Sequence, residues 1–251
     1  MHKSLVEQNF LTYLNQHNAQ LVVVSPAEFT QDMDLFEPPS NLTQILFYER
    51  NNQFLTDKLI LTTARKFVEN DYFGLDKYLN PKLVRRTDLD PKINRDTYVD
   101  SLQEFIQTFD IHSPFISSKA GLICEELLSN ALHLSKDKSL DTSREARLKA
   151  PVLTYGIEND IFGLSVTDFS GTLDLSLIIR YLKKCLTDAK ISLSQKPLRG
   201  GLGFFEIVSS CDAFIVNAHP GIKTELIALI DTKSPQKSMK NLYGFQFFKS
   251  A

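Results

Sequence analysis

The sequence lacks long apolar runs and an excess of charge of one sign, and each absence excludes a class of protein. No apolar run approaches the roughly 18 residues that cross a bilayer, and residues 1–10 (MHKSLVEQNF) are too polar for a secretory signal. The 28 basic and 30 acidic residues give a net charge of −2, which argues against an extended nucleic-acid surface. We therefore expect a soluble, cytoplasmic protein with no membrane or direct nucleic-acid partner.

Cysteines are also few, and their placement excludes a disulfide framework. Cys124, Cys185 and Cys211 are scattered, odd in number and flanked by apolar residues. Such thiols are typical of buried positions in a reducing compartment and not of a metal site. Internal repeats and low-complexity tracts are absent too, and 251 residues suffice for one large or two modest domains.

A charged segment with few large apolar residues predicts a division of the chain. Residues 87–97, which include Pro91, are interpreted as a linker between a domain at 1–86 and a domain at 98–251. In the first part, strand-like runs occupy residues 21–25, 45–49 and 59–63, and helical material is expected around 64–79. This order predicts a small α/β domain with a largely parallel sheet.

The first part faintly resembles a response-regulator receiver domain in its element order and in the phrase FGLDKYLNPKL at residues 73–83. A receiver needs acidic residues after its first strand and at the end of its central strand. Here those places hold Ser25-Pro26 and Tyr48-Glu49. Two readings stay open: a degenerate, regulatory receiver-like module, and the favoured one, an α/β domain for partner binding or dimerisation.

The second part begins with a predicted amphipathic helix at residues 113–134. Ser113 followed by Pro114 is typical of a helix start. The expected apolar stripe consists of Ile116, Ala120, Ile123, Leu127 and Ala131. The expected polar face carries Lys119, Glu126, Asn130 and His133. A plain surface helix is the simplest interpretation of this pattern alone.

Two strand pairs with a glycine cluster between them follow. Residues 152–158 and 161–169 predict a β-hairpin around Asn159-Asp160, and Asp168 ends its second strand. An aspartate there is either an ordinary turn residue or an acceptor for an adenine amino group. The cluster RGGLGF at 199–204 precedes a predicted helix, and strands at 213–218 and 225–230 flank a tight turn. Glycines at a helix start let backbone N–H groups face phosphate oxygens, although a flexible loop has the same composition.

In this order, the motifs resemble those of the GHKL ATPase superfamily, the Bergerat fold shared by histidine kinases and gyrase, over residues 98–232. The phrases DFSGTLD and GGLGF resemble most the anti-sigma-factor serine/threonine kinases. Glu126 and Asn130 match the N box, Asp168 the first glycine box, residues 200–203 the second, and Thr224 the terminal threonine. The resemblance implies an α+β fold, with a Bergerat-type sandwich after the smaller α/β domain.

The resemblance also implies ATP and Mg²⁺ as cofactors and gives roles to residues. Asn130 would bind Mg²⁺, Glu126 would be the general base, and Asp168 with Thr224 would bind adenine. Lys196 or Arg199 could neutralise charge on the transferred phosphoryl group. The expected nucleotide-binding residues are Asn130, Asp168, Gly171, Arg199, Gly200, Gly201, Leu202, Gly203 and Thr224.

Two functions remain open. The first is an ATP-binding protein serine/threonine kinase in a bacterial partner-switching pathway, acting on a sigma factor, an anti-sigma antagonist or a response regulator, and possible as a homodimer. The second is a catalytically inactive interaction module that binds ADP weakly or no nucleotide. The Glu126–Asn130 pair favours the first. Ser170 and Thr172, which stand where the first glycine box has glycines, favour the second. A histidine kinase is disfavoured, because His112 precedes the N-box helix and no helical hairpin carries a histidine.

Overall fold

The computed structural model describes residues 21–24, 44–48, 53–109, 114–136, 149–173, 178, 181, 202–233 and 244–250. These residues form an α+β fold around one mixed sheet of eight strands, in the order β1-β2-β8-β6-β7-β5-β4-β3. The strands are β1 Leu21–Val24, β2 Gln44–Tyr48, β3 Val84–Asp88, β4 Val152–Glu158, β5 Ile161–Asp168, β6 Ala213–His219, β7 Lys223–Asp231 and β8 Gly244–Lys249. The helices are α3 Gln53–Glu69, α4 Arg95–Gln107, α5 Pro114–Lys136 and α7 Leu202–Ser210, with short 3-10 turns η2 Leu75–Lys77 and η3 Pro81–Leu83.

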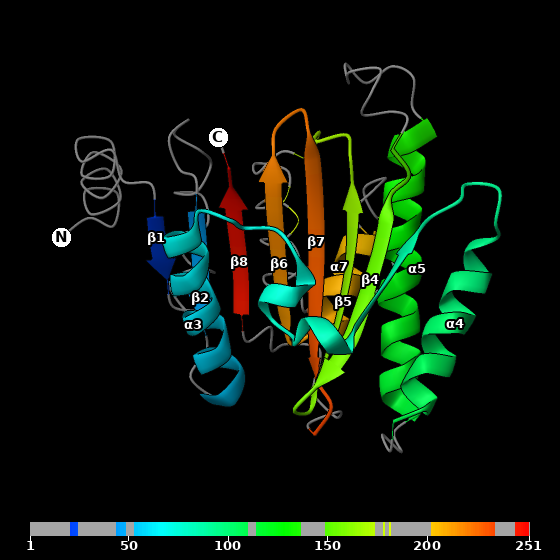
Figure 1. The fold of residues 1–251 in the computed structure, drawn as a ribbon, viewed down its shortest axis with the longest axis horizontal. Coiled ribbons are helices and arrows are strands. Elements are labelled where there is room, and N and C mark those ends of the chain that lie inside the picture. The colour runs from blue at the N-terminus through cyan, green and yellow to red at the C-terminus, as the bar shows by residue number, and fades with distance from the viewer. Residues whose placement is uncertain are drawn as a thin grey trace, which may run out of the picture.

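Helices cover both faces of the sheet. In the view of Figure 1, α3 lies in front of the sheet and α7 lies behind it. One core joins α4, α5 and α7 to one face, and a second core joins α3 and η2 to the other face. No described helix is long and apolar enough to cross a membrane.

The predicted helix at 113–134 is confirmed as α5, and its stripe is buried as expected. Ile116, Ala120 and Ile123 have no exposed surface, and Leu127 has 1%. Helix α4, which was not predicted, begins after Asn94, whose side chain accepts a hydrogen bond from the backbone N–H of Asp96. The prediction for Ser113 lies outside the described residues.

The predicted strand at residues 59–63 is wrong, because this run lies inside α3. Leu55 and Leu59 face the second core with helical spacing, while Leu61 is 71% exposed. The expected helical stretch of 64–79 also ends early. Glu69 closes α3, and Asn70 then takes a φ of 50°.

The predicted strands at 21–25 and 45–49 are confirmed, and β1 pairs with β2 in parallel. They do not form a sheet of their own, since β2 pairs antiparallel with β8. The segment predicted as a linker contains the end of β3 and the start of α4, so only residues 89–94 lie between regular elements. The division into two domains therefore has no matching break in the sheet, and independent folding of the two parts stays a prediction.

The hairpin of β4 and β5 is confirmed, with Asn159 and Asp160 at φ 47° and 66°. Both values belong to the left-handed region that a tight hairpin turn needs. The strands and helix predicted after the glycine cluster are present as α7, β6 and β7, and β6 pairs antiparallel with β7. Strand β8 was not predicted. It lies between β2 and β6 in the sheet, so it connects the first two strands to the strands of the second part of the chain.

Candidate functional site

The strand register brings two of the predicted site residues together. Asp168, the last residue of β5, lies directly opposite Thr224 near the start of β7. Val166 and Leu226 form the register pair two positions away from Asp168 and Thr224. Val166 belongs to the core under α5 and α7, and Leu226 packs against that core. Since side chains alternate along a strand, Asp168 and Thr224 point to that same face. α5 packs against both strands.

Asp168 is a buried carboxylate that its own loop partly satisfies. Its Oδ1 accepts hydrogen bonds from the backbone N–H of Ser170, at 2.8 Å, and from the Ser170 hydroxyl. Burial raises the pKa of Asp168, and the hydrogen bonds from Ser170 and Gly171 oppose this rise. The carboxylate thus lies in an apolar environment where one more donor would be strongly bound.

Thr224, unlike Asp168, has no hydrogen bond to its side chain in the described part of the chain. It is 1% exposed, and its hydroxyl has no hydrogen-bond partner among the residues that the structure describes. Leaving a buried polar group unsatisfied costs about 1–3 kcal/mol. A ligand that supplied an acceptor or a donor here would recover that free energy.

Gly171 fixes the loop next to this pair. Its φ is +60°, and a Cβ atom there would lie 2.6 Å from the backbone N of Gly221. The Gly221 N–H donates to the carbonyl of Gly171 at 3.0 Å. The loop after β5 and the turn before β7 are therefore locked together, and no side chain fits at position 171. Its predicted contact with the nucleotide stays a prediction.

Glu126 lies on α5 where this helix packs against α7. A Cβ atom on Gly203 would lie 2.9 Å from Cδ of Glu126, so the carboxyl group covers the backbone of α7 at that point. Burial raises the pKa of Glu126, and the neighbouring Glu206 carboxyl raises it further, while Arg95 opposes the rise. Asn130, one turn along α5, is exposed.

Part of the predicted site lies outside the description. Lys196, Arg199, Gly200 and Gly201 are not among the described residues, nor are the side chains of Leu202 and His133. Leu202 and Gly203 open α7 instead of preceding a helix. Their expected contact with phosphates stays a prediction.

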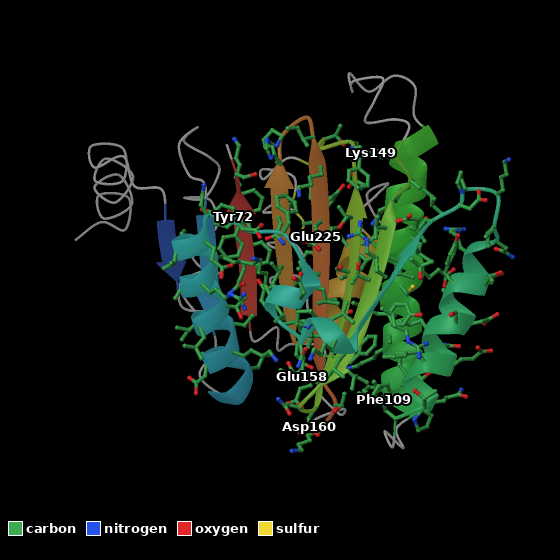
Figure 2. The ribbon with its side chains drawn as sticks, in the orientation of Figure 1. Tyr72, Phe109, Lys149, Glu158, Asp160 and Glu225 are labelled. Carbon is green, nitrogen blue, oxygen red and sulfur yellow. The ribbon has the colours of Figure 1, made fainter. Side chains whose placement is uncertain are left out.

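Sequence reasoning missed Glu206 and a hollow on the opposite face of the sheet, lined by both polar and apolar residues. The hollow has a volume of about 540 Å³ and includes Thr167, Lys223 and Glu225, the direct sequence neighbours of Asp168 and Thr224. Figure 2 shows Glu225 over the middle of the sheet. The hollow is therefore back to back with the Asp168–Thr224 pair and separate from it. Its residues come from β3, β4, β5 and β7, from the segment between α3 and β3, and from the loop after β5. They share no common motif, which is why no pattern predicted the hollow.

The cysteines behave as predicted where they are described. Cys124 and Cys211 are both buried. Burial raises the pKa of the Cys124 thiol to about 12, so it is unreactive at neutral pH. Cys185 lies outside the described residues.

Comparison of the chain with known proteins finds no sequence relative and one weak structural likeness. No protein-family model and no curated protein sequence matches the chain. Among solved structures, the chain is similar to the crystal structure of the SiaB-SiaC complex from Pseudomonas aeruginosa. The TM-score is 0.38 at 13% identity, over 69% of this chain and 99% of that chain. A likeness of this size carries no argument about function, which therefore rests on the residues themselves.

Proposed function

We propose that the chain binds ATP with the adenine ring against Asp168 and Thr224, and that it transfers the terminal phosphoryl group to a hydroxyl of a regulatory protein. The observation that carries this proposal is the Asp168–Thr224 pair. Both side chains are buried, and they lie side by side on one face of the sheet at paired positions of β5 and β7. The Thr224 hydroxyl has no hydrogen-bond partner among the described residues.

The chemistry of the pair suits one edge of adenine. That edge offers an amino group, which donates, next to a ring nitrogen, which accepts. A carboxylate such as Asp168 accepts the first bond, and a hydroxyl such as Thr224 can donate the second, directly or through a water molecule. Guanine presents an acceptor where adenine has its amino group, so it would face the Asp168 carboxylate with no donor.

The remaining roles fall on α5. Asn130 has an exposed amide whose oxygen would hold Mg²⁺ beside the phosphates, and an amide oxygen is a suitable hard ligand for this ion. Glu126 would take the proton of the attacking hydroxyl. Its raised pKa brings it toward the range in which a carboxylate is an effective general base.

A second function has one specific observation in its favour. Of the two residues that replace the glycines of the first glycine box, Ser170 donates hydrogen bonds to Asp168, and Thr172 lies with its hydroxyl 3.1 Å from that of Ser170. A loop that satisfies its own carboxylate fits a module that binds partner proteins and no nucleotide. The two functions differ in whether purified protein binds ATP.

Calorimetric titration with ATP, ADP and GTP, with and without Mg²⁺, tests the proposal. We expect Mg²⁺-dependent ATP binding that weakens about tenfold or more in Asp168→Asn, since a bond to a charged group contributes about 1.5–3 kcal/mol. We expect Asn130→Ala to remove the Mg²⁺ dependence and leave the fold intact. Asp160→Asn is the matched control, because it removes the same charge at the opposite end of β5 (Figure 2). No ATP binding by folded wild-type protein would refute this function and leave the interaction module.

A further inference from the structure

The hollow on the face of the sheet opposite the Asp168–Thr224 pair holds charges of both signs. Its volume of about 540 Å³ lies in the range of small-molecule sites, which is about 300–1,000 Å³. A buried carboxylate, two cations and two threonine hydroxyls line it. The bonds that these groups make, and those that they leave unmade, indicate what the hollow can bind.

Glu225, over the middle of the sheet in Figure 2, is the most deeply buried charged residue of the hollow, with 3% of its surface exposed. Its Oε2 accepts hydrogen bonds from the backbone N–H of Gly74 and from Nδ2 of Asn217, both at 2.8 Å. Its Oε1 accepts none from the residues that the structure describes. A buried charge is costly unless it is bonded, so this oxygen would bind an added donor strongly, and a charged one most strongly.

Arg86 and Lys223 bring two positive charges to the hollow from β3 and β7. Neither forms an ion pair with a carboxylate in the described part of the chain. The Lys223 ammonium group lies 3.7 Å from the centroid of the Phe73 ring, which keeps it at the hollow wall. Two cations without an anion form a site for a carboxylate group, which arginine binds through two parallel hydrogen bonds.

Two threonines lie between the cations and Glu225. Thr154 on β4 is paired with Arg86, and Thr167 on β5 is paired with Glu225. Paired residues project to the same face of a sheet, and the strands β3, β4, β5 and β7 are adjacent in this order reversed. Both threonines are half-buried, and neither hydroxyl bonds another described residue. A hydroxyl can donate or accept, so both suit the polar part of a ligand.

The rest of the lining separates into an acidic rim and apolar walls. Asp71 and Asp76 are exposed, and Asp71 is already paired with Lys77 at 2.7 Å, so solvent and this partner weaken their effect on a ligand. The remaining side chains are apolar and favour an apolar group: Phe73, Leu75, Pro81, Val84, Val152 and Phe169.

We propose that the hollow binds a free amino acid with an apolar side chain, whose carboxylate group contacts Arg86 and Lys223 and whose ammonium group contacts Oε1 of Glu225. A simple anion would leave Glu225 without its donor, and a simple amine would leave both cations without an anion. A molecule that carries both charges satisfies all three groups, and the apolar walls hold its side chain. This site goes beyond the proposed ATP site and does not depend on it.

Saturation-transfer NMR of the full chain with each standard amino acid, one at a time and without nucleotide, is the first test. We expect signals from leucine, valine or phenylalanine, and weaker ones from aspartate and glutamate, whose second carboxylate would meet the apolar walls. A folded protein that binds none of the standard amino acids would overturn the inference.

Two variants and two analogues then locate each end of the ligand. The amino acid that binds best is compared with its deaminated acid and with its decarboxylated amine. Arg86→Met should weaken binding of the amino acid and of the acid about tenfold or more, and leave the amine unaffected. Glu225→Gln should weaken binding of the amino acid and of the amine by a similar factor, and leave the acid unaffected.

Matched controls exist for both variants. Arg85→Met changes the next residue of β3, whose guanidinium lies over the Phe105 ring at 4.6 Å, in the core on the other face of the sheet. Glu104→Gln removes a carboxylate from an exposed position of α4. We expect both to bind the amino acid as wild type does. Circular dichroism checks that each variant is folded.

Thr167→Val provides a further test that leaves every charge in place, should Glu225→Gln fail to fold. It removes the hydroxyl opposite Glu225 and should weaken binding of the amino acid about threefold or more. Amino-acid binding that Arg86→Met weakens but Glu225→Gln and Thr167→Val do not would mean a site for anions only, and would overturn the inference. Binding that is equal in all three variants would place the amino acid elsewhere and would overturn it too.

Discussion

Lys66 offers a prediction whose sign is unusual: removing its charge should stabilise the protein. Its side chain has no exposed surface and lies between α3 and the sheet. The ammonium group donates to the hydroxyl oxygen of Tyr78 at 2.8 Å and to Oδ1 of Asn217 at 3.1 Å. It also lies over the rings of Tyr78 and Phe248, at 4.7 and 4.4 Å from their centroids. Among the described residues, no carboxylate forms an ion pair with it.

Burial therefore dominates the ionisation of Lys66. It lowers the pKa from 10.5 to about 7; Glu225 and Asp71 oppose this, and Lys77 adds to it. That difference means that holding the charged form in the folded state costs about 5 kcal/mol at low pH. Between pH 7 and 10.5 the unfolded chain binds a proton that the folded protein does not, so the free energy of unfolding rises with pH there. Below about pH 7 both states are charged, and this contribution is constant.

Lys66→Met keeps the aliphatic stem and removes the ammonium group. The gain of about 5 kcal/mol is reduced by the loss of a donor to Asn217, which costs about 1–3 kcal/mol. We expect a net stabilisation of about 2–4 kcal/mol at pH 7 that shrinks toward pH 10.

Urea unfolding of wild-type protein and Lys66→Met at pH 6.5, 8 and 9.5 measures this difference. Lys82→Met, at an exposed position, is the control for loss of one positive charge and should show no such trend. A variant that is less stable than wild type at pH 6.5, by an amount that does not change with pH, would show that the hydrogen bonds and ring contacts outweigh burial of the charge.

Two further predictions concern the loop and the pair at the site. Gly171→Ala should lower the free energy of unfolding by about 3 kcal/mol or more, because left-handed strain and a clash with the Gly221 backbone add together. Gly221→Ala, at φ +71° with open space around it, should lower the free energy of unfolding by only about 1–2 kcal/mol. Equal losses of stability for the two variants in urea unfolding would contradict the role of the close backbone packing at Gly171. Thr224→Val should stabilise ligand-free protein by about 1 kcal/mol, since it removes an unsatisfied hydroxyl, and should weaken ATP binding in calorimetry. A destabilised Thr224→Val variant would mean that the hydroxyl has a partner.

The elements that sequence reasoning predicted correctly are those whose partners are near in the chain. The hairpin of β4 and β5 follows from alternation and from Asn159-Asp160, which tolerate left-handed backbone. The apolar stripe of α5 repeats every three or four residues and is buried as that period requires. Local pattern and tertiary structure agree in both cases.

The errors come from apolar residues that are exposed and polar residues that are buried. Residues 59–63 look like a strand because Ile60 and Leu61 add to Leu59, yet the first two are 47% and 71% exposed on α3. A short apolar run does not distinguish helix from strand by itself. Strand β8 was missed for the converse reason: Gln246, at its centre, is fully buried and satisfied by Tyr78 and by the backbone of Leu59. Such partners, more than 160 residues away, leave no local pattern.

The candidate site was predictable only as far as the motifs reach. The resemblance paired Asp168 with Thr224, and the register of β5 and β7 brings them together across 56 residues of sequence. Glu206 belongs to no motif, because it comes close to Glu126 only through the packing of α7 on α5. The same holds for Gly203, whose contact with Glu126 was not among the roles that the resemblance implied.

Ser170 provides the sharpest test between the two proposed functions. Its hydroxyl and its N–H both bond Asp168, whereas Thr224 opposite is left without a partner in the described part of the chain. A module that binds no ligand has nothing to offset the cost of that orphan hydroxyl, so the asymmetry favours a ligand that bonds Thr224 and competes with Ser170 for the carboxylate. Ser170→Gly keeps the backbone donor and removes the competing hydroxyl.

We expect Ser170→Gly to bind ATP about 3–10-fold more tightly than wild type, since one net hydrogen bond contributes about 0.5–1.5 kcal/mol. Calorimetry measures this difference, and Ser209→Gly, whose hydroxyl bonds a backbone carbonyl within α7, is the control for loss of a serine side chain elsewhere. Weaker binding in Ser170→Gly would show that the hydroxyl orients Asp168 for the ligand instead of competing with it. The serine that replaces a glycine in the first glycine box would then be part of the binding site.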